Sequence, residues 1–593
     1  MTVSPTAGTV RGESMDDIKD LVVEAGIGNL PSRAAATNAT AVAFRSAGGG
    51  DVTYGELDES VDRCATGLRR LLGREGVIVA VAQVLDPVFA VAYYGIARAG
   101  NVSAVVNPLL HMDGLVRLLR ACGAEAAILT PEMWESLAQV RDSVPLLRDV
   151  VLTTDLPSLA AGTLASAEPE WDSVASIVFT SGTTGAPKAV PLTHRNLTVN
   201  AAQTVHAQEL DASAVMFNYF PTFHTMHLNA AVLAGATQVL YTSPDVVGSL
   251  EAAERHGVTH YYSLPMRLAQ LANDQHARPL PTRLADHQRA MEQPLPTQLP
   301  DDRYAPEQPL PALLADDQRA PQRLLPTVRA LLSGGSALPP RTAAALALRF
   351  GVPVVQGYGF AEASPLTHFN RFDDPRPGSC GRPVAGTECR VVDIGTRDVL
   401  PADEKGEVQI RGPQLMRGYL GQPTTAELDA DGWFATGDVG RIDNDGYLFL
   451  VDRIRDVFKC DNFLVSPTEI EAVLRQHPAV ADCAVVDTPD EVSGAVAYGL
   501  VVLRDTAEPI LPRDTAEPIL PQDTAEPAVV RDTPGSAVPR NTAEPAAIRL
   551  AVNANLPSFM RLAHVEPVAE IPRTRHGKVL RREIRDQLRK RLT

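Results

Sequence analysis

The sequence lacks the clustered cysteines that would indicate a zinc site or a disulfide framework. Only six cysteines occur among its 593 residues, and they are scattered without metal-ligand spacing. Scattered cysteines are typical of reduced thiols in proteins of the cytoplasm. We therefore expect a cytoplasmic protein without disulfide bonds.

Long apolar runs are also missing. The most apolar region, residues 77–100, is interrupted by Asp86 and Pro87, whereas a membrane span needs about 20 apolar residues. We expect instead a buried strand at residues 77–82 and then a helix that Asp86 caps, Pro87 opens and Gly100 ends. The N-terminus has no basic start followed by an apolar core, so neither a signal peptide nor a transmembrane segment is predicted.

The chain has fewer basic than acidic residues. The chain has 54 Lys and Arg against 71 Asp and Glu, a net charge of −17, and we expect no nucleic-acid partner. Residues 573–591 are locally basic, which we interpret as a solvated helix face. With 45% apolar residues, the chain can bury a large core and form more than one domain.

Alternating strand and helix patterns fill most of the chain. Between residues 51 and 155, short apolar runs alternate with amphipathic helical patterns, which predicts a parallel or mixed sheet covered on both faces. Residues 377–450 read as short strands and turns, a β-rich subdomain. Near the C-terminus, a helix at 467–474 precedes strands at 483–486 and 498–503. The predicted fold class is α/β, with a smaller α+β unit after the main one.

Two repetitive stretches interrupt this pattern. Residues 271–328 hold imperfect copies of a unit ending in Leu-Pro, and residues 504–548 hold five copies of a nine-residue unit seeded by Asp-Thr-Ala-Glu-Pro. Prolines at this density preclude a regular helix or a central strand, and few aromatic residues are present to form a core. We predict two solvated insertions; for the first, a partner-binding loop is the alternative.

One glycine- and hydroxyl-rich string follows an apolar strand. It reads Thr180-Ser181-Gly182-Thr183-Thr184-Gly185-Ala186-Pro187-Lys188. The glycines let backbone N–H groups converge on an anion, the hydroxyls add donors, and Lys188 adds a mobile cation. A Walker A loop is excluded because Pro187 precedes the lysine. The string predicts a phosphate cradle at the C-terminal end of a strand, where open α/β sheets bind ligands; a solvated loop is the alternative.

This string resembles the phosphate loop of the acid-adenylating superfamily, which includes acyl-CoA synthetases, aryl-CoA ligases, peptide-synthetase adenylation domains and firefly luciferase. Ala189 stands where that family usually has glycine. The resemblance covers about residues 40–270, 328–503 and 548–585, and is closest to fatty-acid–CoA ligases and fatty-acyl-AMP ligases.

The resemblance implies two domains. A large domain, residues 1–454, would contain mixed sheets covered by helices, the β-rich subdomain and the first insertion. A small mobile domain, residues 455–593, would contain the second insertion. Arg455 occupies the family's hinge position.

The resemblance also implies the ATP and magnesium sites. Asp438, which follows Thr-Gly, would accept the ribose hydroxyls, although an Asp in a turn is the alternative. Glu362 matches the magnesium-binding carboxylate, with Thr184 as a second metal ligand; Ala361 replaces the hydroxyl residue that usually precedes it. The ATP-binding residues would be Thr180, Ser181, Gly182, Thr183, Thr184, Gly185, Lys188, Gly334, Gly335, Tyr358, Asp438 and Arg453.

The acyl pocket would be lined by His224 and Gly357. His227 lies three residues after His224, but a metal site would lack a third ligand. No carboxylate occurs between residues 215 and 240. A buried substrate ammonium would therefore be unpaired and costly, which disfavours an α-amino acid.

The chemistry implied is that of a ligase. ATP would convert a carboxylic acid, expected to be a fatty acid, into acyl-AMP and pyrophosphate, and CoA would then take the acyl group. Lys578, in a Gly-Lys motif near the end of the chain, matches the catalytic lysine together with Glu362. In members of this superfamily a tunnel admits the acceptor thiol, and a glycine usually faces it; Asn462 stands at the position of that glycine.

Three alternatives remain from the sequence. A fatty-acyl-AMP ligase would pass the acyl group to the phosphopantetheine of an acyl carrier protein. A stand-alone peptide-synthetase adenylation domain, or a homologue that only binds ligands, would form no thioester with CoA.

Overall fold

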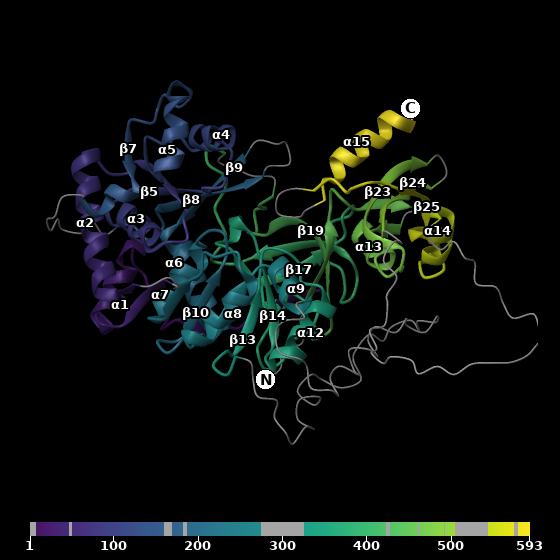
Figure 1. Cartoon of the computed structure of the whole chain (residues 1–593), viewed down its shortest axis with the longest axis horizontal. Coiled ribbons are helices and arrows are strands. Elements are labelled where there is room, and N and C mark those ends of the chain that lie inside the picture. Colours follow the sequence, from purple (N-terminus) through teal and green to yellow (C-terminus); the bar gives the residue numbers. More distant parts are fainter. Residues whose placement is uncertain are drawn as a thin grey trace, which may run out of the picture. The chain divides into compact units, whose positions relative to one another are not determined.

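The computed structural model divides the chain into two compact units, Met1–Thr436 with Gly440–Leu450, and Gly437–Val439 with Val451–Thr593 (Figure 1). The division lies close to the predicted domain limit at residue 454. No helix of the described chain is long and apolar enough to cross a membrane. The residues that the structure describes are 8–46, 50–158, 169–181, 187–273, 325–422, 427–460, 463–490, 493–504, 544–573 and 579–592.

A six-stranded sheet occupies the first half of the large unit, in the order β7-β6-β4-β5-β8-β9. All neighbours are parallel except β8 and β9, which form an antiparallel hairpin at one edge. The strands are β4 (Ile78–Ala82), β5 (Val102–Val106), β6 (Ala126–Leu129), β7 (Asp149–Leu152), β8 (Val174–Ser181) and β9 (Pro187–Thr193).

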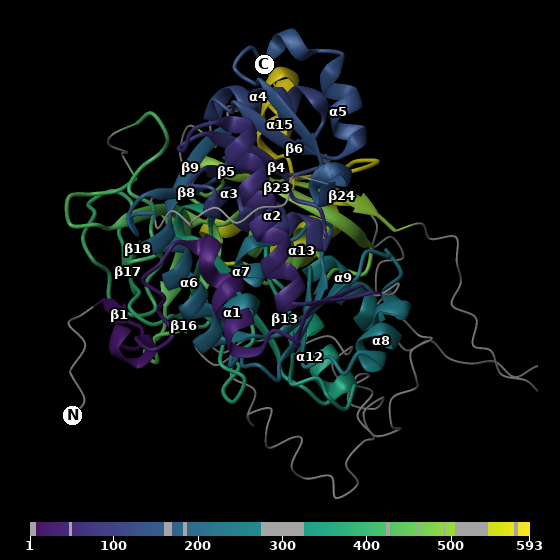
Figure 2. The same ribbon diagram turned by 90° about the vertical axis from the view of Figure 1, so that its left-hand side faces the viewer.

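Helices cover both faces of this sheet, as its strand-helix alternation predicts. Successive residues of β4 point to opposite cores: Val79 packs with α2 and α3, and Ala80 with α4 and α5. Figure 2 shows α2 in front of the strands. Asp86 caps α3 by accepting a hydrogen bond from the Val88 backbone, as expected. The helices are α2 (Tyr54–Leu72), α3 (Pro87–Arg98), α4 (Met112–Cys122) and α5 (Pro131–Ala138).

A nine-stranded sheet follows, in the order β16-β15-β14-β13-β12-β10-β11-β2-β3. Its strands from β14 to β2 are parallel, so their carboxyl ends meet at one edge, and the outer pairs are antiparallel. The strands are β2 (Val42–Ser46), β3 (Asp51–Thr53), β10 (Val215–Tyr219), β11 (Thr237–Leu240), β12 (His260–Ser263), β13 (Ala330–Ser333), β14 (Val354–Gly359), β15 (Leu366–Phe369) and β16 (Arg382–Pro383).

Helices pack on both faces of the nine-stranded sheet too. Phe217 of β10 lies in a core with α8, α9 and α12, whereas its neighbour Met216 lies in a core with α6 and α7. The helices of this part are α1 (Leu30–Asn38), α6 (His194–Ala207), α7 (Thr225–Ala234), α8 (Val246–Arg255), α9 (Pro265–Asn273) and α12 (Pro340–Phe350).

The predicted β-rich subdomain is a five-stranded sheet in the order β1-β17-β18-β19-β20. The N-terminal strand β1 pairs with β17, an association that the sequence did not predict. The strands are β1 (Thr9–Arg11), β17 (Glu388–Val392), β18 (Gly406–Arg411), β19 (Phe434–Ile442) and β20 (Leu448–Arg453).

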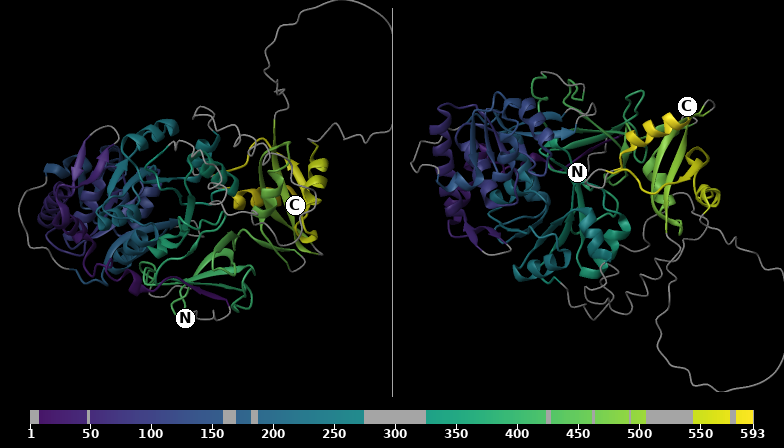
Figure 3. Two further views of the ribbon diagram at one scale, coloured as in Figure 1. Left: turned by 90° about the horizontal axis from the view of Figure 1, so that it is seen from below. Right: turned by 45° about the horizontal axis from the view of Figure 1, so that its top comes forward.

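The small unit is built on a three-stranded sheet in the order β23-β24-β25 (Figure 3). Cys483 of β23 packs with α13 and α14, and Ala484 packs on the opposite face with α15. The elements are β21 (Phe458–Cys460), β22 (Phe463–Val465), α13 (Pro467–Leu474), β23 (Val480–Asp490), β24 (Gly494–Leu503), α14 (Pro545–Asn553), β25 (Leu562–Pro567) and α15 (Arg581–Leu592).

The predicted limits of both insertions are too wide. Leu271, in the last turn of α9, lies in the same core as Leu325 and Val328, and Ile548 of α14 is fully buried in the small unit. Apolar residues at the ends of the repeats therefore pack as parts of the fold. Residues 274–324 and 505–543 lie outside the described residues.

Candidate functional site

The phosphate-loop string lies at the turn of the β8–β9 hairpin. Thr180 pairs with Lys188, and Ser181 with Pro187, so the loop leaves the carboxyl end of β8, as predicted. The strand continues two residues beyond the expected end at residue 179. The loop residues Gly182, Thr183, Thr184 and Gly185 lie outside the described residues.

Lys188 is held by two residues to which the sequence alone assigned no role. Its Nζ lies 2.6 Å from Oε1 of Glu427 and 4.4 Å from the centre of the Tyr419 ring. The Tyr419 hydroxyl donates a 2.8 Å hydrogen bond to Oε1 of Glu362. The predicted phosphate lysine and the predicted metal carboxylate are thus joined through Tyr419.

Glu362, the predicted magnesium carboxylate, is buried. It lies in the short helix Ala361–Ala363 directly after β14 and is 8% exposed. Burial and the charge of Glu362 raise the pKa of Tyr419, which therefore remains a hydrogen-bond donor. No group of three His, Cys, Asp or Glu side chains forms a metal cage among the described residues. Mg²⁺ commonly binds through one or two carboxylates plus substrate phosphates, so Glu362 fits that ion.

The predicted ATP-binding residues Gly334, Gly335 and Tyr358 lie at the ends of neighbouring strands, because β13 and β14 pair with Ser333 opposite Gln356. At Gly334 a Cβ atom would meet nothing within 4 Å, so the space beside this turn is open. At Gly357 a Cβ atom would lie 3.0 Å from the His368 carbonyl oxygen, so a side chain there would crowd β15. Gly335 has a φ of +86°, which favours glycine. Tyr358 is 8% exposed and packs on the ring of Phe360.

Asp438 and Arg453, both predicted to contact the nucleotide, lie together. The Arg453 Nε is 2.5 Å from the Asp438 Oδ1, and the Asp438 side chain is buried whereas Arg453 is half exposed. The Ile454 backbone donates to the Gly437 carbonyl at 2.9 Å, which holds the two strand ends together. The two predicted nucleotide contacts therefore form an ion pair with each other.

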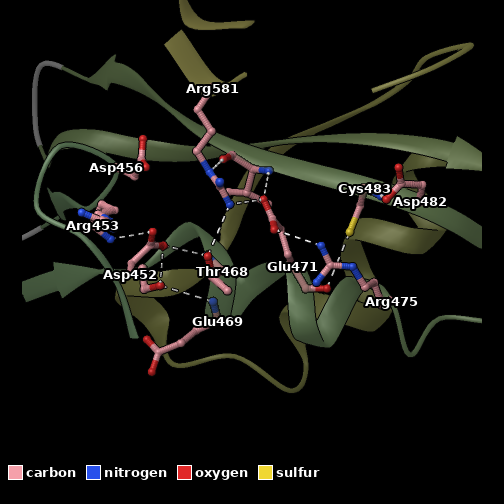
Figure 4. Close-up of polar contacts among 12 residues, drawn as sticks. Asp452, Arg453, Asp456, Thr468, Glu469, Glu471, Arg475, Asp482, Cys483 and Arg581 are labelled. Atoms are coloured by element: carbon pink, nitrogen blue, oxygen red, sulfur yellow. Dashed lines mark hydrogen bonds and ion pairs between the residues drawn. The ribbon is translucent and has the colours of Figure 1, made fainter. Parts of the chain in front are cut away.

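The predicted hinge is bonded to the C-terminal helix. Arg585 of α15 donates to the carbonyl oxygens of Arg455 at 3.3 Å and of Asp456 at 3.0 Å. Asp452 accepts hydrogen bonds from the Ser466 hydroxyl at 2.9 Å and the Thr468 backbone at 3.2 Å (Figure 4). The turn that contains Arg455 is therefore fixed to the small unit on two sides.

Lys578 belongs to residues 574–578, which lie outside the described residues, as does Asn462. We call the connection 574–578 the lysine loop. The residues on either side of it are joined by a β-bridge between Arg573 and Val579 and by a 2.9 Å hydrogen bond from the Leu580 backbone to the Pro572 carbonyl.

Two ion pairs flank the same loop. Arg573 lies 2.7 Å from Asp482. Arg581 lies 2.6 Å from Glu471, a contact that Figure 4 shows. Burial raises the pKa of Glu471, while the charge of Arg581 opposes that shift. The expected solvated face is wrong for Arg581, which is 8% exposed, because it supplies the counter-charge of a buried carboxylate.

His224 and His227 lie at the start of α7 as neutral rings. The His224 Nδ1 accepts a 3.3 Å hydrogen bond from the Met226 backbone and caps the helix. Surrounding atoms lower the pKa of His224 to about 4, although its side chain is exposed to solvent. The ring of His224 is therefore uncharged at neutral pH, and it caps α7 without adding a positive charge there. The His227 ring centre lies 5.5 Å from that of His224 and 4.3 Å from that of Tyr262.

Comparison with known families decides the affiliation. Residues 31–420 match the model of AMP-binding enzymes, and residues 469–532 match the C-terminal domain of AMP-binding enzymes. The chain belongs to the AMP-binding enzyme family. This AMP-binding enzyme is an ATP-dependent, AMP-forming acid–CoA ligase, as its relatives and family indicate.

Two relatives illustrate the similarity in sequence. The chain is 32% identical to a feruloyl-CoA synthase of Amycolatopsis sp. over 497 residues, 81% of this chain and 89% of the relative. It is 30% identical to 4-coumarate–CoA ligase 3 of Arabidopsis thaliana over 484 residues, 77% and 78% of the two chains. Neither name refers to a fatty acid or a carrier protein, so those two expectations are not confirmed.

Solved structures share the fold of this AMP-binding enzyme. ATP-bound MatB from Rhodopseudomonas palustris matches with a TM-score of 0.75 at 23% identity, over 95% of this chain and all of that one. The anthranilate CoA ligase AuaEII, in complex with anthranoyl-AMP, matches with a TM-score of 0.74 at 23% identity, over 96% and 98%.

Proposed function

We propose that this AMP-binding enzyme activates a small aromatic acid of the hydroxycinnamate type and transfers it to CoA. The observation that carries the proposal is the cluster of aromatic rings at the start of α7, of which His227 and Tyr262 are buried. The His227 ring centre lies 5.2 Å from that of Phe220 and 4.3 Å from that of Tyr262, beside the solvent-accessible His224. Flat rings favour a planar aryl substrate through offset or edge-to-face contacts. The names of the relatives, 4-coumarate ligase and feruloyl-CoA synthase, support the same class.

In the first half-reaction, an oxygen of the substrate carboxylate attacks the α-phosphorus of ATP, and pyrophosphate leaves. Both reactants are anions, so positive groups must offset the charge that develops. Lys578 would contact the carboxylate and the α-phosphate, while Lys188 and the hairpin loop would bind the β- and γ-phosphates. Glu362 would hold Mg²⁺, which supplies charge neutralisation at the phosphates when bound.

Separate groups would bind the ribose and the adenine. Asp438 would exchange its 2.5 Å contact with Arg453 for the ribose hydroxyls, leaving Arg453 to contact the nucleotide. Tyr358, which follows the β14 residues paired with β13, would pack on adenine.

In the second half-reaction, the CoA sulfur attacks the acyl carbonyl carbon, and AMP leaves with the bonding electrons. A rotation of the small unit about Arg455 would exchange Lys578 for the segment containing Asn462. Because α15 is bonded to the backbone of Arg455, the hinge and the helix that follows the lysine loop would move together.

The test is a substrate panel with 4-coumarate, ferulate, benzoate, octanoate and malonate. ATP–pyrophosphate exchange measures the first step, and acyl-CoA formation measures the whole reaction. We expect the two hydroxycinnamates to have the highest kcat/KM, by at least tenfold over octanoate. A preference for octanoate would refute the aromatic assignment, whereas exchange with every acid but no acyl-CoA would refute CoA as acceptor.

A further inference from the structure

The ammonium of Lys188 already has a carboxylate partner within the large unit. Glu427 is 2.6 Å away, and the two side chains are 28% and 33% exposed. Partial burial raises the pKa of Glu427, but the hydrogen bond and charge of Lys188 outweigh it, so the pKa lies below its usual value. Glu427 is therefore a carboxylate anion at neutral pH, placed at the base of the phosphate loop.

The position of Glu427 is fixed by its backbone. Its carbonyl oxygen accepts a 2.6 Å hydrogen bond from Ala435 of β19, and the next residue, Leu428, forms a β-bridge with Phe434. Lys188 is fixed in the same way, because it lies in β9 and pairs with Thr180 of β8. The backbone of both residues is therefore fixed, that of Lys188 in β9 and that of Glu427 by its contacts with the start of β19.

Lys188, Glu427 and Glu362 together carry one negative charge, before any phosphate is added. A bound triphosphate would bring several more negative charges to the same place, and like charges in a partly buried site repel strongly. Lys188 can reduce this repulsion only by turning its protons toward the phosphates. The Tyr419 ring, 4.4 Å from Nζ, can stabilise the ammonium whether or not Glu427 holds it.

We propose that Glu427 is a counter-ion that competes with the β- and γ-phosphates for Lys188. It holds the lysine before ATP binds, yields it to ATP, and takes it back as pyrophosphate leaves. Glu427 would thereby weaken nucleotide binding and speed pyrophosphate release. This role rests on the proposed assignment of Lys188 to the triphosphate.

The test measures the Kd of ATP and of pyrophosphate by calorimetry without acid substrate, so that catalysis is not required. Glu427→Gln keeps the shape of the side chain and removes its charge. We expect both Kd values to fall about three- to tenfold, the range for a partly exposed, charge-assisted contact. Glu427→Ala should shift them in the same direction. Glu251→Gln, an exposed position on α8, changes net charge equally and should leave both values within twofold.

A double-mutant cycle with Lys188→Ala separates the possible outcomes. We expect Lys188→Ala to raise both Kd values, and Glu427→Gln to change them less than twofold when Lys188 is absent. If Lys188→Ala has no effect, the lysine assignment itself is wrong. If Lys188→Ala weakens binding but Glu427→Gln does not tighten it, the lysine assignment stands and the counter-ion role fails. Equal tightening in both backgrounds, or a higher Mg²⁺ requirement in Glu427→Gln, would also overturn the competition.

Discussion

Replacement of Arg581 by Met should destabilise the small unit around the lysine loop. The side chains of Arg581 and Glu471 are 9% and 3% exposed, and their contact is 2.6 Å. Removing one partner of such a buried pair typically costs about 3–5 kcal/mol. Glu471 keeps a 3.1 Å contact with Arg475 and accepts a 2.9 Å hydrogen bond from Val485. We therefore expect a smaller loss in the free energy of unfolding, about 2–3 kcal/mol.

The loss should depend on pH. Burial raises the pKa of Glu471. At a pH just above the usual pKa of a glutamate, Glu471 therefore keeps a proton in the folded unit that it loses in the unfolded chain. That contribution to stability falls as pH rises. Without Arg581 the pKa of Glu471 should rise further, so the defect should be largest at neutral pH and shrink toward pH 5.

Amide hydrogen exchange is the suitable assay, because the Val485 N–H donates directly to Glu471. Exchange at Val485 and its neighbours in β23 should be faster in Arg581→Met than in wild type. Arg582→Met is the matched control, since Arg582 is exposed on the same helix. Equal acceleration in both variants, or a defect that does not change between pH 7 and pH 5, would refute the reasoning.

Four further outcomes are expected. Lys578→Ala should lower ATP–pyrophosphate exchange by about 10²–10³, the cost of losing one charged group at the transition state, while thioester formation from supplied acyl-AMP persists; near-normal exchange would remove the assignment. Asp438→Ala should raise the KM for ATP about tenfold or more, since hydrogen bonds to a charged acceptor contribute roughly 1.5–3 kcal/mol, and an unchanged KM would exclude the ribose role. Asn462→Gly should speed acyl-CoA formation and leave exchange unchanged if the amide narrows the thiol path; equal rates would show that it does not. Acid should destabilise the fold, because burial lowers the pKa of three histidines to about 3 or 4: His194, His260 and His368. The unfolded chain binds these protons below about pH 6.5 and the folded chain does not, so urea titrations should show the free energy of unfolding falling by about 1.4 kcal/mol per pH unit for each histidine between pH 6.5 and 4.

Local patterns were sufficient for most of the fold. The predicted helix at 467–474 matches α13. The strand predicted at 77–82 matches β4, and the helix predicted to be capped by Asp86 matches α3. These features depend on residues within a few positions of one another, where periodicity and capping are informative. The limits of the insertions were wrong because Leu271 and Ile548 are buried by partners that are distant in sequence.

Candidate site residues could be named from the sequence where they belong to a short motif. They could not be named where they depend on contacts between residues that are distant in sequence. Lys188 and Glu362 belong to recognisable motifs. Glu427 lies 239 residues from Lys188, and no local signal distinguishes it from other acidic surface residues. Arg581 was expected in solvent because its neighbours are charged; only the fold shows that Glu471 lies beneath it.

The N-terminal strand β1 has a protective role. It pairs with β17 through Thr9 opposite Arg390 and Arg11 opposite Glu388, and the Arg11 side chain adds a 3.1 Å contact to Glu388. Without it, the outward hydrogen-bonding groups of β17 would be uncovered. An uncovered sheet edge can pair with the same edge of another molecule. A shortened chain that begins after residue 12 would therefore be prone to self-association through the uncovered edge of β17.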